Sequence, residues 1–270
     1  MEQALDAVQE KEFILPHVPE GKRIIPNDMI RSSLFNISNH NCKREYLKER
    51  KLYSFQSTEI TYTGEELRQD DEDIWLQLIY LASNARSEKV ECRPYTFLKH
   101  IKWPQRTQYR DKLKDCLTRM SATTIKIYNT DFQQGIGFSL VRKFEWNDSG
   151  ESLKEWKIWL EPEVVKLFQA IGRMYTKVHW DQRMKLKPLA KWLHAFYSSH
   201  AEPQAIFILK LLQLSGSKTK NLKHFKEILR AALIELIKVG FLEHADIDQR
   251  NYLHVIRKKS TYKRVEMNDV

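Results

Sequence analysis

The stretch "LQLSGSKTKNLKHFKEILRAALIEL" (residues 212–236) joins a small, basic loop to an amphipathic helix. From Asn221 onward, apolar residues recur at the spacing of one helix side: Leu222, Phe225, Leu229, Ala232, Leu233 and Leu236. Lys223, Glu227 and Arg230 fall on the opposite side. We therefore expect one side of this helix to pack into a core and the other to face solvent or a partner.

The loop before this helix is small and positively charged. Residues 210–230 contain six basic residues and one acidic residue. Ser215, Gly216, Ser217 and Thr219 would let a phosphate approach the backbone N–H groups at the helix start. A helix about 10–12 Å wide fits the major groove of B-DNA. The pattern favours a DNA-recognition helix, and the alternative is a lysine-rich solvated face.

Composition limits the class of protein. The chain has 270 residues, of which 42% are hydrophobic, and this length is typical of one or two domains. Its formal charge of +10 favours an anionic partner, either nucleic acid or a membrane surface. The longest apolar runs, around 205–214 and 231–242, contain charged residues, so no membrane span is expected. The segment "MEQALDAVQEKEF" lacks the apolar core of a secretory signal, which predicts a cytoplasmic protein.

Motifs for metal binding, cofactor binding or catalysis are absent from the sequence. Cys42, Cys92 and Cys116 form no CxxC pair, and the nine histidines form no HExxH motif. The segment "SGSKT" lacks the spacing GxxxxGK[ST] of a phosphate-binding loop. We therefore expect no metal, no cofactor and no enzymatic activity.

The first half of the chain contains the element order of a winged helix. Residues 1–26 are predicted to form an arm, because three prolines interrupt them. Acidic residues 70–73 precede an apolar helix and are predicted to cap it rather than to bind a metal. The expected elements are a strand or hairpin at 53–64, helices at 74–85, 95–101 and 107–120, a hairpin at 122–146 and a strand at 155–160. This order predicts a winged-helix domain over residues 27–160.

The second half repeats this order with little similarity in its letters. The expected elements are a strand at 175–180, helices at 188–200, 205–214 and from Asn221, and a hairpin at 240–258. They predict a second winged-helix domain over 175–258, followed by a basic, flexible tail over 259–270. The predicted fold class is α+β, with two tandem winged-helix domains.

Candidate DNA contacts lie on both predicted recognition helices and on the second hairpin. At the helix over 107–120 they are weaker but similarly placed: Arg106, Thr107, Arg110 and Lys114. His224 is either an exposed helix residue or a contact to a base or phosphate. Arg250 and Asn251 are either ordinary turn residues or contacts from the second wing. Arg230 completes the basic side of the helix that begins at Asn221.

Five segments together resemble the TrfA family of plasmid replication initiators. They are "RIIPNDMIRSSLF" (23–35), "ITYTGEELRQDDEDIWLQLIYLA" (60–82), "LTRMSATTIKI" (117–127), "WDQRMKLKPLAKWLHAFYSSHAEP" (180–203) and "LSGSKTKNLKHFKEILRAALIEL" (214–236). The resemblance implies a bacterial cytoplasmic protein that binds repeated origin sequences (iterons) as double-stranded DNA. It also implies opening of an AT-rich region, contact with the resulting single-stranded DNA, recruitment of the host replicative helicase and initiation machinery, and a homodimer in equilibrium with the monomer.

The resemblance assigns DNA contacts to the entry of the second recognition helix: Ser215, Ser217, Lys218, Lys220 and Lys223. The chain departs from the family because "SSLF" (32–35) lies in a segment predicted as helical and makes no QLxLF-like clamp-binding peptide. Direct contact with the clamp is therefore not implied. The alternative function is a dimeric winged-helix transcriptional regulator without initiation activity, and a nicking initiator enzyme ranks third.

Overall fold

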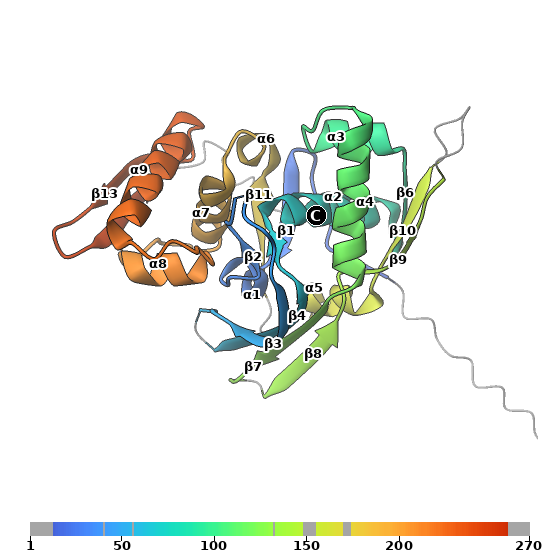
Figure 1. Cartoon of the computed structure of the whole chain (residues 1–270), viewed down its shortest axis with the longest axis horizontal. Helices are drawn as coiled ribbons and strands as arrows, with labels where there is room; N and C mark the ends of the chain where they lie inside the picture. Colours follow the sequence, from blue (N-terminus) through green and yellow to red (C-terminus); the bar gives the residue numbers. More distant parts are fainter. Residues whose placement is uncertain are drawn as a thin grey trace, which may run out of the picture.

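The computed structural model describes residues 13–39, 41–55, 57–131, 133–147, 155–169 and 174–258. The first twelve residues of the predicted arm and the predicted tail over 259–270 lie outside these ranges. Helices and strands are mixed along the chain, which confirms the α+β class. Figure 1 shows an N-terminal part (the described residues of 13–169, blue to yellow) beside a smaller C-terminal part (174–258, orange to red).

Each part contains a unit of six elements in the same order: helix, strand, helix, helix, strand, strand. In the N-terminal part the unit comprises α2 (Gln69–Ala85), β6 (Lys89–Cys92), α3 (Pro94–His100), α4 (Thr107–Ser121), β9 (Val141–Glu145) and β10 (Trp156–Leu160). In the C-terminal part it comprises α7 (Pro188–Ser198), β12 (Ile206–Phe207), α8 (Ile208–Leu214), α9 (Leu222–Lys238), β13 (Leu242–Ile247) and β14 (Tyr252–Arg257). The sheet orders also correspond, as β6-β10-β9 and β12-β14-β13.

The strand β12 lies within a stretch that the sequence predicts as continuous helix, residues 205–214. Ile206 and Phe207 pair with Leu253 and Tyr252 of β14, so α8 begins only at Ile208. A two-residue strand is too short to show an alternating pattern. The apolar run therefore contains both a strand and a helix.

The hairpin expected over residues 122–146 is divided between two sheets. Its first two strands, β7 (Thr124–Asn129) and β8 (Gln134–Phe138), pair as expected but belong to a four-stranded sheet, β3-β4-β7-β8, with β3 (Tyr46–Leu52) and β4 (Thr58–Glu65). Ile125 and Ile127 are buried and Lys126 is exposed, the alternation of a sheet covered on one side. β9 begins after this hairpin and pairs with β10 instead.

A strand that the sequence did not predict, in the segment expected to form an irregular arm, connects the two parts. β1 (Lys22–Pro26) pairs antiparallel with β11 (Tyr175–His179), and Ile24 and Ile25 are fully buried. The remaining short elements are α1 (Asn27–Ile30), β2 (Phe35–Asn36), β5 (Leu67–Arg68), the 3-10 helix η1 (Pro162–Val165), α5 (Lys166–Gln169) and α6 (Trp180–Arg183). The N-terminal segment therefore forms part of the core where the two parts meet.

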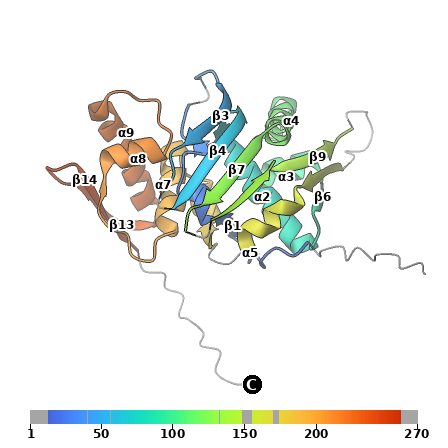
Figure 2. The same cartoon turned by 90° about the horizontal axis from the view of Figure 1, so that it is seen from below.

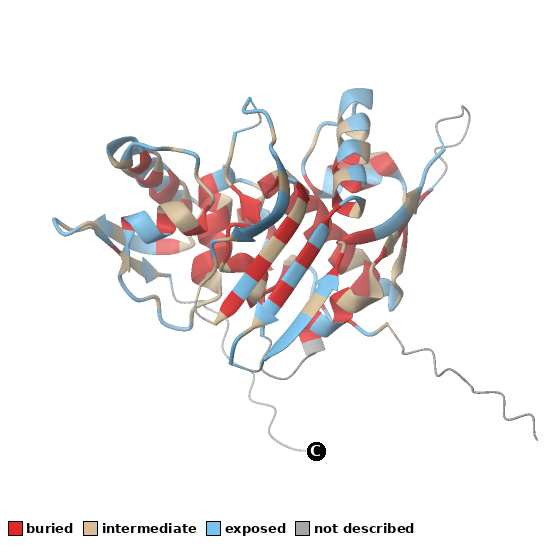
Figure 3. Ribbon diagram, turned by 60° about the horizontal axis from the view of Figure 1, so that its bottom comes forward, coloured by how far each residue is buried: buried red, intermediate tan, exposed pale blue. Residues whose placement is uncertain are grey.

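Helix α9 has the orientation that its sequence predicts. Phe225, Leu229 and Leu236 are fully buried, whereas Ile234 on the same helix is half exposed. Figure 3 shows the buried residues concentrated in the middle of the molecule and on the inner sides of the helices. Within the described residues, no helix is both long and apolar enough to cross a membrane.

Four consecutive carboxylates at the start of α2, here called the acidic cluster, bind cations from both parts: Asp70, Asp71, Glu72 and Asp73. The predicted cap is present, because Asp71 accepts a hydrogen bond from the backbone N–H of Arg68 at 2.8 Å. The fully buried guanidinium of Arg183 in α6 lies 2.8 Å from Asp73 and 3.2 Å from Glu72. The acidic cluster therefore joins the two parts through ion pairs.

We predict that Arg183→Met destabilises the whole chain. The substitution leaves Glu72 and Asp73 as buried charges without their shared partner, which costs about 3–5 kcal/mol. The matched control is Arg142→Met, because Arg142 pairs with Glu88 on the surface and such pairs contribute about 0–1 kcal/mol. Urea unfolding measures both variants. Equal stabilities would show that the buried cluster does not join the two parts.

Candidate nucleic-acid interface

Helix α9 begins with a complete side-chain cap. The side-chain oxygen of Asn221 accepts hydrogen bonds from the backbone N–H groups of Lys223 at 2.8 Å and His224 at 3.3 Å. These two N–H groups are therefore already bonded and are not free for a phosphate. Contacts to an anion at this end must come mainly from side chains, which corrects the expectation that backbone N–H groups receive the phosphate.

Several cations of the predicted interface are exposed on α9 and just before it. Lys220, Lys223 and Arg230 all have exposed side chains. His224 is exposed as well, and its Nδ1 lies 3.4 Å from a carboxylate oxygen of Glu227. The side chains of these four residues are therefore accessible from solvent.

Ser215 and Gly216, which were predicted to let a phosphate approach, instead pack against the N-terminal part. Ser215 is fully buried, and its carbonyl oxygen accepts a hydrogen bond from the backbone N–H of Ile37 at 3.1 Å. Gly216 has φ +63°, and a Cβ there would lie 2.6 Å from the Cβ of Asn36. Ser215 therefore cannot contact DNA, because it is packed against the N-terminal part. The residues are small because two segments approach each other closely here.

Lys218, the first cation of the segment 212–236, forms ion pairs with the N-terminal part. Its Nζ lies 2.9 Å from Glu66 and 3.1 Å from Glu45. Ser217 is half-buried, and its hydroxyl accepts a hydrogen bond from the backbone N–H of Thr219 at 3.3 Å. We call residues 215–218 the docking loop, because they bind the N-terminal part.

Helix α4 presents a weaker set of candidate contacts. Arg106 precedes the helix, and both Arg106 and Thr107 are exposed. Arg110 is half-buried, with its guanidinium 3.6 Å from Asp111. Lys114 lies over the ring of Trp146, with Nζ 5.0 Å from the ring centre. The end of α4 that begins at Thr107 is thus its most accessible part.

The turn between β13 and β14 holds the two residues predicted for the second wing. Arg250 is exposed. Asn251 has φ +65°, and its carbonyl oxygen accepts a hydrogen bond from the backbone N–H of Ile208 at 3.0 Å. Asn251 therefore has a structural role in the turn, whereas Arg250 is free to reach a partner.

A set of cations on β3 and just before it was not predicted from the sequence. The segment "KREYLKERK" (43–51) contains five basic and two acidic residues, and this bias was the available signal. Lys43, Lys48 and Arg50 are exposed. Figure 2 shows α9, β3 and α4 along the same edge of the molecule, with β3 between the two helices. The basic strand therefore extends the candidate interface from one helix to the other.

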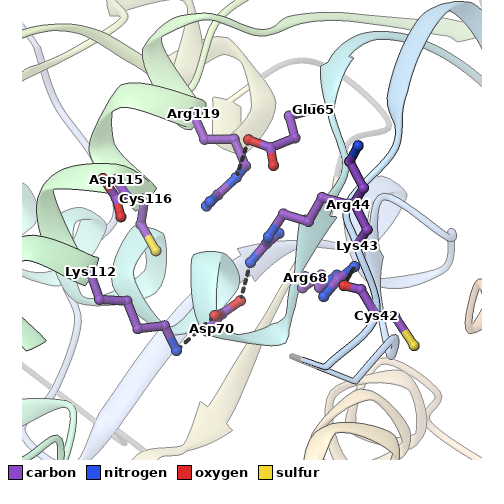
Figure 4. Close-up of a pocket in the computed structure, with 10 residues that line it drawn as sticks. All are labelled: Cys42, Lys43, Arg44, Glu65, Arg68, Asp70, Lys112, Asp115, Cys116 and Arg119. Atoms are coloured by element: carbon purple, nitrogen blue, oxygen red, sulfur yellow. Dashed lines mark hydrogen bonds and ion pairs between the residues drawn. The ribbon is translucent and has the colours of Figure 1, made fainter.

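A pocket of about 320 Å³ lies between α4 and the loop before β3 (Figure 4). Arg44 lies 3.0 Å from Asp70 across this pocket, and Lys112 of α4 lies 3.0 Å from the same carboxylate. Burial raises the pKa of Asp70, but Lys112 and Arg44 outweigh burial and lower the pKa to about 2. Arg119 of α4 binds Asp71. The pocket is therefore lined by mutually bound charges that fix α4 to α2.

The fold resembles that of two solved structures. Crystal structures of domains 2 and 3 of RctB superimpose with TM-scores of 0.59 and 0.57. They share 12% and 11% sequence identity with the chain, cover 85% and 83% of it, and are themselves covered to 96% and 95%. At this identity the likeness concerns the fold.

Sequence comparison identifies the family. The model of the TrfA protein family matches residues 1–257. The plasmid replication initiator protein TrfA of Escherichia coli is 30% identical over 246 residues, which cover 90% of the chain and 64% of that relative. The chain belongs to the TrfA family, as its sequence predicts.

We predict that Asp70→Asn lowers stability at neutral pH. The folded state lowers the pKa of Asp70 from 3.8 to about 2, so its ionised form stabilises the fold above about pH 4. This contribution, on the order of 2 kcal/mol, is lost as the pH falls from about 4 to 2. Urea unfolding at several pH values should show the two proteins converging in acid. A difference independent of pH would contradict this role, and Asp111→Asn on the exposed side of α4 is the control.

Proposed function

We propose that the chain is a plasmid replication initiator that binds iterons as double-stranded DNA through two winged-helix domains. The proposed domains are those predicted from the sequence, over residues 27–160 and 175–258. One observation carries the proposal: the third helix of each six-element unit, α4 and α9, lies on the same edge of the molecule with exposed cations near its start. A helix in this position of a winged helix enters the major groove.

The proposed contacts combine the predicted residues that are accessible with the cations of β3. On the C-terminal part they are Ser217, Lys220, Lys223, His224, Arg230 and Arg250, and on the N-terminal part Arg106, Thr107, Arg110, Lys114, Lys48 and Arg50. Contacts from lysine and arginine to phosphates fix the register, whereas side chains reaching base edges read the sequence. Because its exposed cations are denser, α9 should contribute most of the affinity.

Initiation needs steps after DNA binding, and these belong to the same proposal. They are opening of the origin, contact with the exposed single strand, recruitment of the host helicase and initiation machinery, and exchange between dimer and monomer in the bacterial cytoplasm. The protein would act as a binding protein rather than an enzyme. The second candidate is a dimeric transcriptional regulator, which the same exposed helices favour equally. An assay of origin opening separates the two, because a regulator binds the duplex without melting it.

We predict a footprint of about two helical turns on the origin of the replicon that encodes the chain, because both helices engage one side of the duplex. If about six to eight phosphates are neutralised, the logarithm of affinity should fall with that of salt concentration at a slope of about −5 to −7. Lys220→Glu with Lys223→Glu should weaken binding strongly, and Lys48→Glu with Arg50→Glu more moderately.

The matched control is Lys166→Glu, an exposed residue of α5, which lies at the opposite edge in Figure 2. DNase footprinting and binding titrations at several salt concentrations measure these effects. A footprint of one turn, unaffected by the β3 substitutions, would show that only the C-terminal part binds DNA. Equal losses in the control would show that total charge, rather than this edge, determines binding.

A further inference from the structure

The docking loop places a candidate DNA-binding cation in an intramolecular ion pair. Lys218 lies three residues before the N-cap of α9, and its Nζ is held by Glu66 and Glu45 of the N-terminal part. Burial lowers the pKa of Lys218, but hydrogen bonds to Glu66 and Glu45 outweigh burial and raise the pKa above its ordinary value. The lysine is therefore charged and, although it is exposed like Lys220 and Lys223, it is already paired with two carboxylates.

The two carboxylates differ in how they would respond to loss of the lysine. Glu45 is 63% exposed, so water can solvate it. Glu66 is only 7% exposed, but the guanidinium of Arg68 lies 3.6 Å away and the backbone N–H of Glu45 donates to it at 3.2 Å. Breaking a buried ion pair is usually costly because one charge is left without a polar partner. Here each carboxylate would keep another polar partner. Exchange of Lys218 from these carboxylates to another anion therefore carries a small penalty.

Because of where the loop lies, the anion that would compete with the two carboxylates for Lys218 is a phosphate of bound DNA. The loop leads directly into α9, and its first residues stay fixed to the N-terminal part through the hydrogen bond between Ser215 and Ile37. The four-carbon stem of a lysine lets its ammonium move while the backbone remains in place. A duplex bound at the start of α9 would bring phosphates within reach of the same ammonium.

We propose that Glu45 and Glu66 form an autoinhibitory contact that withholds Lys218 from DNA, and that a DNA phosphate replaces both carboxylates when α9 binds. This inference rests on the proposed function, because it needs α9 to bind a duplex. The contact lowers affinity for any duplex, since a phosphate contact carries no sequence information. Base contacts therefore contribute a larger share of the binding free energy, which favours an iteron over other DNA.

A double-mutant cycle tests the proposal. The variants are Glu45→Gln with Glu66→Gln, Lys218→Met, and the combination of all three, with a fluorescein-labelled duplex of random sequence as the probe. With Lys218 present, replacing both glutamates should raise affinity for this duplex about fivefold more than the charge-matched control does. With Lys218 replaced by Met, the two gains in affinity should be equal. The control is Glu49→Gln with Glu59→Gln, which removes two exposed, ion-paired carboxylates from β3 and β4.

The possible results distinguish a failure of the autoinhibitory contact from a failure of the proposed function. An equal gain with and without Lys218, or a gain no larger than that of the control, would overturn the autoinhibitory contact while leaving the proposed function intact. A wild-type chain that binds neither this probe nor origin DNA would overturn both. Urea unfolding checks that each variant folds, and if replacement of the nearly buried Glu66 prevents folding, the exposed Glu45→Gln alone completes the cycle.

Discussion

The structure depends on the buried ion pairs at the start of α2. The acidic cluster binds Arg44, Lys112 and Arg119 of the N-terminal part on one side and Arg183 and Lys191 of the C-terminal part on the other. Buried charges require well-placed partners, because an unpaired one costs several kcal/mol. The cluster therefore allows few alternative arrangements of the two parts. Together with the β1–β11 pairing, it fixes the position of α9 relative to α4.

This fixed arrangement has a direct consequence for DNA binding. If α4 and α9 both enter the major groove, as proposed, their fixed separation must match the spacing of successive major grooves, and the protein would then select the length of its site as well as its sequence. β3 lies between the helices, and in the proposed complex its exposed cations would face the DNA backbone between the two grooves. The residue pair Arg44 and Glu45 connects these features, because Arg44 binds the acidic cluster and Glu45 binds Lys218. A change at the docking loop therefore lies next to the ion pairs that hold α4.

The sequence predicted features that depend on local patterns. The buried side of α9, its start after Asn221, the extent of α4 and the hairpin at β13–β14 follow from helical spacing, alternation and turn residues. Contacts between distant residues were not predictable in this way. Asp73 and Lys191 are 118 residues apart, and no local pattern links them. The glycine and serine of the docking loop fitted two explanations, phosphate approach and close packing, and only the position of Asn36 decides between them.

The most direct test of the fixed arrangement is the distance between α4 and α9 in solution. Spin labels on genetically encoded amino acids at the exposed positions Thr118 of α4 and Ala231 of α9 avoid the exposed Cys42. Pulsed electron resonance should give one narrow distance distribution that is the same in the free protein and with origin DNA, and that broadens in Arg183→Met. A broad distribution in the free protein, narrowing only when DNA is added, would show that DNA rather than the acidic cluster sets the arrangement.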